Sequence, residues 1–111
     1  MSTQWQRTAF QIDLSRPEDA YRKMDSLSAV QQMGQRYLLA ISGGRVAGGE
    51  DGIYLPVRHG YWVSIHLHAN DTYIVRRVLY RKGQGRVKQE WRDVYAEELG
   101  QIAFKASCYN N

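Results

Sequence analysis

The sequence predicts an α+β fold, in which a curved antiparallel β-sheet packs two helices on one face. Several short stretches alternate apolar and polar residues with the period of two that is typical of strands, and glycine, asparagine or aspartate turns separate them. One stretch near each end of the chain instead has apolar residues at helical spacing. The length of 111 residues, 43% of them hydrophobic, indicates one domain that spans residues 1–111.

The N-terminal half is predicted to contain strands and one helix. Phe10, Ile12 and Leu14 alternate along the first strand. The helix has a capping signal, because Ser15 is followed three residues later by Glu18, and a glycine ends its apolar stripe. The expected elements are a strand at 4–14, a helix from 15 to Gly34, strands at 36–42 and 45–47, a loop at 48–52, and at 53–57 a strand placed at the sheet edge because of Pro56.

The C-terminal half is predicted to form two hairpins and a final helix. Asn70-Asp71 is typical of a two-residue hairpin turn, and the KGQG stretch at 82–85 indicates a second turn. Asp93 is expected to cap the last helix, with two glutamates in its first turns. The expected elements are strands at 61–69, 72–81 and 86–91, and a helix whose apolar stripe is Tyr95, Leu99, Ile102, Ala103 and Ala106.

The expected two-residue turn determines which side chains share a face. It pairs Ala69 with Thr72, and a slip of one residue would move every side chain to the other face. The predicted core face then carries Tyr61, Val63, Ile65, Leu67, Ile74, Arg76, Val78 and Tyr80. If the second turn is also even, Val87, Gln89 and Trp91 join this face. The predicted core residues are Val63, Ile65, Leu67, Ile74 and Val78. The opposite face carries Trp62, Ser64, His66, His68, Tyr73, Val75, Arg77, Leu79, Arg81, Arg86, Lys88, Glu90 and Arg92.

Positive charge is concentrated on the same strands. Residues 72–92 hold seven of the 15 Lys and Arg side chains but only one of the 11 acids, Glu90. Such asymmetry can steer an anionic partner, although a solvated face with arginine stems over apolar atoms has the same pattern. The candidate binding surface is Trp62, His66, His68, Tyr73, Arg77, Arg81, Arg86, Lys88 and Arg92.

Two kinds of partner suit this surface, a nucleic acid and an acidic host protein. Aromatic side chains among basic ones can stack bases and hold phosphates. The expected function is therefore a small binding protein rather than an enzyme, without catalytic residues, and self-association into a homo-oligomer is also compatible with the composition.

Two chemical alternatives use the histidines. A small basic nuclease could use His66, His68, Tyr73, Arg77 and Arg81 on one sheet face. Gly60 followed by His66-x-His68 is similar to the first half of the cupin metal motif, since histidines two apart on a strand point to the same side. However, the glutamate of that motif is missing and no second motif follows, so neither a metal nor another cofactor is expected.

Compartment follows from what the sequence lacks. Cys108 is the single cysteine, so no internal disulfide can form, and the N-terminal residues have no apolar signal core. No run of about 18 apolar residues exists, so no membrane association is expected. These features together predict a cytoplasmic protein.

One resemblance adds context. DTYIVRRV followed by EWRDVYAEELGQIAFKASCY, within residues 71–109, resembles the C-terminal half of small orphan proteins from phages of actinobacteria. The resemblance carries no activity with it. It implies a phage or mobile-element protein that acts in the host cytoplasm by binding host components.

Overall fold

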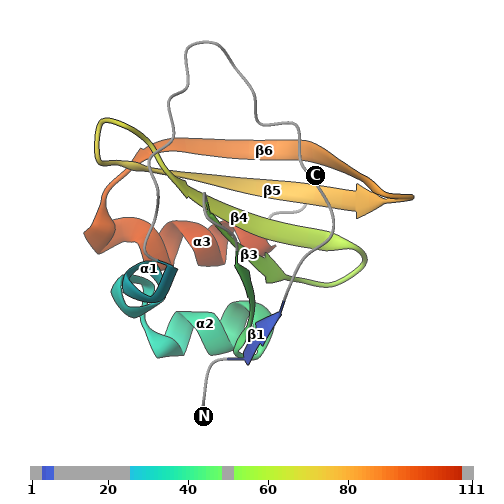
Figure 1. The fold of residues 1–111 in the computed structure, drawn as a ribbon, viewed down its shortest axis with the longest axis horizontal. Coiled ribbons are helices and arrows are strands. Elements are labelled where there is room, and N and C mark those ends of the chain that lie inside the picture. Colours follow the sequence, from blue (N-terminus) through green and yellow to red (C-terminus); the bar gives the residue numbers. More distant parts are fainter. Residues whose placement is uncertain (1–3, 7–25, 49–51, 109–111) are drawn as a thin grey trace.

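The computed structural model describes residues 4–6, 26–48 and 52–108, which form one sheet with helices packed on one of its faces (Figure 1). The elements, in chain order, are β1 (Gln4–Gln6), α1 (Ser26–Met33), α2 (Gln35–Ser42), β2 (Arg45–Gly48), β3 (Gly52–Pro56), β4 (Tyr61–Leu67), β5 (Tyr73–Arg81), β6 (Gln84–Val94), the 3₁₀ turn η1 (Ala96–Glu98) and α3 (Leu99–Cys108).

The sheet follows the order of the chain. Its strand order is β1-β2-β3-β4-β5-β6; β1 runs parallel to β2, and each later neighbour is antiparallel. The predicted α+β class is therefore confirmed, with three α-helices in the described residues where two were expected. The predicted strand residues 7–14 and the start of the first predicted helix, 15–25, lie outside the described residues.

The predicted strand at 36–42 is wrong, because these residues form helix α2. Leu38, Ile41 and Ser42 are the buried positions, at the spacing of one helical face. A short apolar run without alternation does not distinguish strand from helix, and leucine, alanine, glutamine and arginine favour the helix. Gly34, at φ 93°, ends α1 as expected, and Gly43 ends α2 in the left-handed conformation with its N–H on the Leu39 carbonyl.

The prediction that β3 lies at the sheet edge is also wrong, because β3 pairs with β2 on one side and with β4 on the other. The Val57 N–H donates to Tyr61 O, so Pro56 points its nitrogen the other way, toward β2. The β2–β3 pairing reaches only as far as Ala47↔Tyr54. Pro56 therefore lies beyond that ladder and removes no hydrogen bond from it.

The turn between β4 and β5 contains three residues rather than two. His68 N donates to Thr72 O at 2.8 Å, Asp71 N donates to His68 O at 3.0 Å, and Asp71 has φ 67°. A type I turn followed by a residue in the left-handed conformation is a common three-residue hairpin connection. The side-chain oxygen Oδ1 of Asn70 also accepts the Thr72 N–H at 3.0 Å, which fixes the turn.

The extra turn residue reverses the predicted faces of β5. Leu67 pairs with Tyr73, Ile65 with Val75 and Val63 with Arg77. The helix-covered core accordingly contains Val63, Ile65, Tyr73 and Val75, with Leu67 partly buried against it. Ile74 and Val78 are buried as predicted, but they share the opposite face with His66 and Trp62, their partners in the ladder.

The second hairpin has an even turn, which was the condition for placing Trp91 on the core face, but its ladder is irregular. Lys82 and Gly83, at φ 54° and 79°, form a two-residue turn between Arg81 and Gln84. Register shifts follow between Arg77 and Val78 and between Tyr73 and Val75. As a result Trp91 pairs with Val75 and packs against the core, whereas Val87 pairs with Val78 on the opposite face.

The start of the last helix differs from the prediction as well. Asp93 does not cap it but lies within β6 at φ 55°. Tyr95 is the N-cap residue instead, and its N–H donates to Glu98 Oε1 at 3.1 Å. Leu99, Ala103 and Ala106 are buried as predicted, while Tyr95 is exposed. Gly100 allows close packing, because a Cβ there would lie 2.5 Å from the Tyr37 ring.

We expect Ile65→Ala to lower the free energy of unfolding by about 2–5 kcal/mol, because it removes a fully buried side chain between sheet and helices. Urea denaturation of both proteins measures the change. Gln101→Ala, on the exposed side of α3, is the control and is expected to stay within about 0.5 kcal/mol of the parent. A loss below about 1 kcal/mol for Ile65→Ala would contradict the core described above.

Candidate functional site

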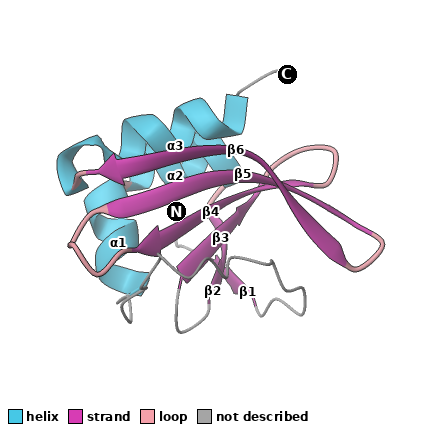
Figure 2. Cartoon of the chain, turned by 90° about the horizontal axis from the view of Figure 1, so that it is seen from above, coloured by secondary structure: helices cyan, strands magenta, loops and turns pink. Residues whose placement is uncertain are grey.

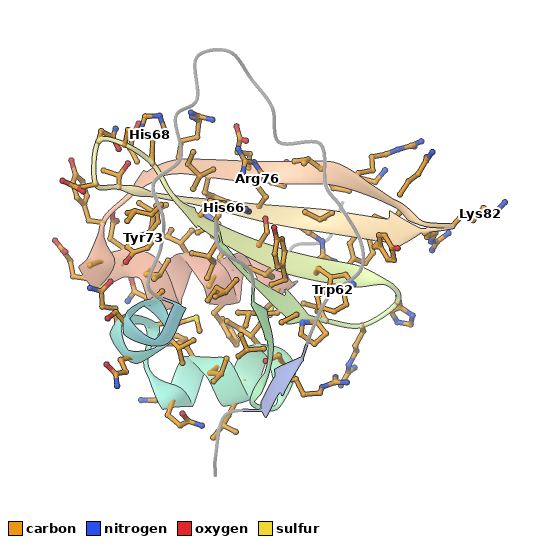
Figure 3. All side chains as sticks on the ribbon, in the orientation of Figure 1. Trp62, His66, His68, Tyr73, Arg76 and Lys82 are labelled. Atoms are coloured by element: carbon orange, nitrogen blue, oxygen red, sulfur yellow. The ribbon has the colours of Figure 1, made fainter. Side chains whose placement is uncertain are left out.

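The nine residues of the predicted binding surface do not form one face. Figure 3 shows Tyr73 and Lys82 at opposite ends of β5. Part of the set lies under the helices, part lies in the buried middle of the opposite face, and part lies at the free end of the β5–β6 hairpin.

Tyr73 and Arg77 lie on the helix side of the sheet. Tyr73 is buried, and its hydroxyl donates to Gln32 Oε1 in α1 at 2.6 Å. Arg77 donates from one terminal nitrogen to the carbonyls of Ala106 and Ser107, at 2.8 and 3.0 Å, in the last turn of α3. Its guanidinium also lies 4.0 Å from the centre of the Tyr61 ring. Both residues therefore connect the sheet to the helices.

Arg76 and Glu90 form an ion pair in the middle of the opposite face. The Arg76 side chain is only 2% exposed, and its Nε donates to Glu90 Oε1 at 2.7 Å. The two residues are ladder partners on β5 and β6. Arg92, which is exposed, donates to the second carboxylate oxygen at 3.3 Å. The single acid of residues 72–92 is thus already engaged by two arginines.

His66 belongs to the same buried region, next to Arg76 in Figure 3. Its Nε2 lies 3.3 Å from the Tyr54 hydroxyl oxygen, and the two rings meet edge to face. Burial, and secondarily the positive charge of Arg76, lowers the pKa of His66 to about 3. The neighbouring Ser64 Oγ is buried without a hydrogen bond to a described residue. His66 is therefore a neutral interior side chain rather than an exposed contact.

His68 and Trp62 are partly buried. His68 directly precedes the β4–β5 turn, and its Nδ1 accepts the Asn70 N–H of that turn at 3.1 Å. Because His66 is buried and His68 takes part in the turn, the two do not present a common exposed pair. In the described part of the chain, no three His, Cys, Asp or Glu side chains gather closely enough to hold a metal ion.

The remaining predicted residues lie at the free end of the hairpin. We call residues 79–89 the basic hairpin end; its exposed cations are Arg81, Lys82, Arg86 and Lys88. None of these four side chains makes a hydrogen bond or an ion pair with a residue that the structure describes. The segment contains no Asp or Glu. Figure 2 shows this end of the hairpin extending away from the helices.

Lys82 is the residue that the sequence prediction did not include in the binding surface. It forms the turn with Gly83, and Figure 3 shows its side chain at the outermost end of the hairpin. The available signal was a lysine directly between two basic strands, Arg81 on one side and Arg86 on the other.

Comparisons with known proteins give no relatives: no family model, curated protein or solved structure matches the chain. No helix of the described residues is long and apolar enough to cross a membrane.

We expect acid to destabilise the protein through His66. Its pKa is about 3 when folded against 6.5 for the ordinary side chain, so the unfolded chain binds an additional proton between these pH values. Within that window stability should fall with falling pH, by up to about 1.4 kcal/mol per unit from this residue. Urea denaturation at pH 6.0, 5.5 and 5.0 should show a steeper loss for the parent than for His66→Gln. Parallel slopes would contradict the burial of His66.

Arg77→Gln should lower the free energy of unfolding by about 1–3 kcal/mol, because the carbonyls at the end of α3 lose their charged donor. Arg86→Gln makes the same chemical change at an exposed position and should cost less than about 0.5 kcal/mol. Urea denaturation compares the two. Equal effects would show that Arg77 does not connect β5 to α3.

Proposed function

We propose that the protein is a small binding protein that contacts an anionic macromolecule through its basic hairpin end. One observation carries the proposal: four exposed cations lie together, unneutralised by any described residue, on a segment without an acid. The other arginines of the two strands have internal partners, as Arg76 and Arg77 do.

Electrostatics gives the physical reason. Neighbouring like charges on a short hairpin repel each other, and a polyanion that approaches them relieves this repulsion. Leu79 and Arg86 are ladder partners, so Arg81, two residues beyond Leu79, lies on the same side of the ribbon as Arg86. Such a paired arrangement can engage two phosphates or carboxylates at once.

The nuclease alternative is less well supported. It needs His66, His68, Tyr73, Arg77 and Arg81 on one face, but Tyr73 and Arg77 contact the helices while His66 is buried on the other side. A binding role needs no such convergence. The resemblance to proteins of actinobacterial phages adds that the partner would be a host macromolecule in the cytoplasm.

The proposal predicts that Arg81→Glu combined with Arg86→Glu weakens retention on immobilised heparin, a polyanion. The matched control is Arg36→Glu with Lys105→Glu, which has the same net charge but changes exposed residues of α2 and α3. The hairpin variant should elute at a clearly lower salt concentration than the control, and both should keep the parent's urea midpoint. Equal elution of the two variants would show that the hairpin has no special role.

A further inference from the structure

The shape and composition of the basic hairpin end restrict the kind of polyanion it suits. We propose that its partner is double-stranded DNA and that the tip of the hairpin enters the major groove. This inference rests on the function proposed above and deepens it. Three features of the described residues carry it: the missing stacking surface, the missing apolar contact surface, and the width of the tip.

Single-stranded nucleic acids are bound largely by stacking bases on exposed aromatic side chains. The sequence suggested Trp62 and Tyr73 for this purpose. Tyr73 is 7% exposed and belongs to the core, and Trp62 is partly buried. Among the residues that the structure describes, the exposed large hydrophobic ones are Tyr95 and Phe104, and neither belongs to the basic hairpin end. The single aromatic residue of the basic hairpin end, Tyr80, is only partly exposed, so the segment offers no fully exposed ring for stacking a single strand.

The same observation argues against an acidic protein. Protein interfaces derive most of their binding energy from a few buried aromatic or large side chains surrounded by a polar rim. The basic hairpin end offers exposed charge and glutamine but no exposed large apolar side chain. Phosphate contacts need only cations, because counterion release supplies the free energy.

The tip is narrow enough for a groove. β4 pairs with β5 as far as Tyr61↔Leu79, and the Tyr80 N–H still donates to Gly60 O. From Arg81 to Gln84 the chain is paired only within the hairpin, and the turn adds just Lys82 and Gly83. The major groove of B-form DNA, about 12 Å wide, admits a two-stranded ribbon, whereas the major groove of duplex RNA is too narrow.

The side chains of the hairpin suit contacts both with base edges and with phosphates. Arg81 and Lys82 lie at its end, and either side chain can donate to guanine in the major groove. Arg86 and Lys88 lie further back along β6, where they would meet phosphates. Four phosphate contacts at most predict a slope of log Kobs against log salt no steeper than about −3.6.

Fluorescence anisotropy tests the inference with four labelled probes: a 20-base-pair DNA duplex, one of its strands alone, an RNA duplex of the same sequence, and poly-glutamate. The DNA duplex should bind at least tenfold more tightly than each of the others at 100 mM salt. Arg86→Ala should make the salt slope shallower by about 0.9 if it contacts one phosphate. Lys105→Ala, on exposed α3, is the matched control and should leave the slope unchanged.

A second duplex tests the groove. Bulky substituents at C5 of its pyrimidines fill the major groove, where the thymine methyl group lies, and should weaken binding at least tenfold. Unchanged binding to this duplex, or equal binding to the single strand, RNA or poly-glutamate, would overturn the inference but leave the proposed function standing. Binding of no probe, or binding that the double reversal of Arg81 and Arg86 does not affect, would overturn both.

Discussion

The three-residue turn between β4 and β5 is the constraint on which the rest of the structure depends. Asp71 adopts the left-handed conformation there, and the side-chain oxygen Oδ1 of Asn70 accepts the Thr72 N–H. Because side chains alternate along a strand, one additional turn residue exchanges the two faces of β5 completely. The turn thereby directs Val75 and Arg77 toward the helices, and it directs Arg76 to the other side of the sheet.

This exchange separates cations that look equivalent in the sequence. Arg77 binds the carboxyl end of α3, where its charge also complements the helix dipole, and Arg76 is buried beside Glu90. Breaking such a buried pair is costly, so these two charges belong to the stability of the fold. The exposed cations Arg81, Lys82, Arg86 and Lys88, near the turn of the β5–β6 hairpin, are the ones available to a partner.

The sequence predicts the antiparallel sheet, the helical face and the concentration of charge, because alternation and helical spacing are local properties. It does not predict the faces of β5, because Asn70-Asp71 suits both a two-residue turn and the last two residues of a three-residue turn. The Leu-rich stretch of α2 was ambiguous for the same reason: a short apolar run fits either element until it packs. The partners of Arg77 lie about 30 residues away along the chain, so no local pattern indicates them.

The most direct test of this account is the register of β4 against β5, measured by NMR in solution. Ile65 and Val75 form a non-hydrogen-bonded pair of the antiparallel ladder, and so do Val63 and Arg77. The α-protons of such pairs lie close together. Nuclear Overhauser contacts between the α-protons of both pairs are expected. Contacts between the α-protons of Ser64 and Arg77 would instead mean a two-residue turn, would return Arg77 to the outer face, and would contradict the assignment of internal and available charges.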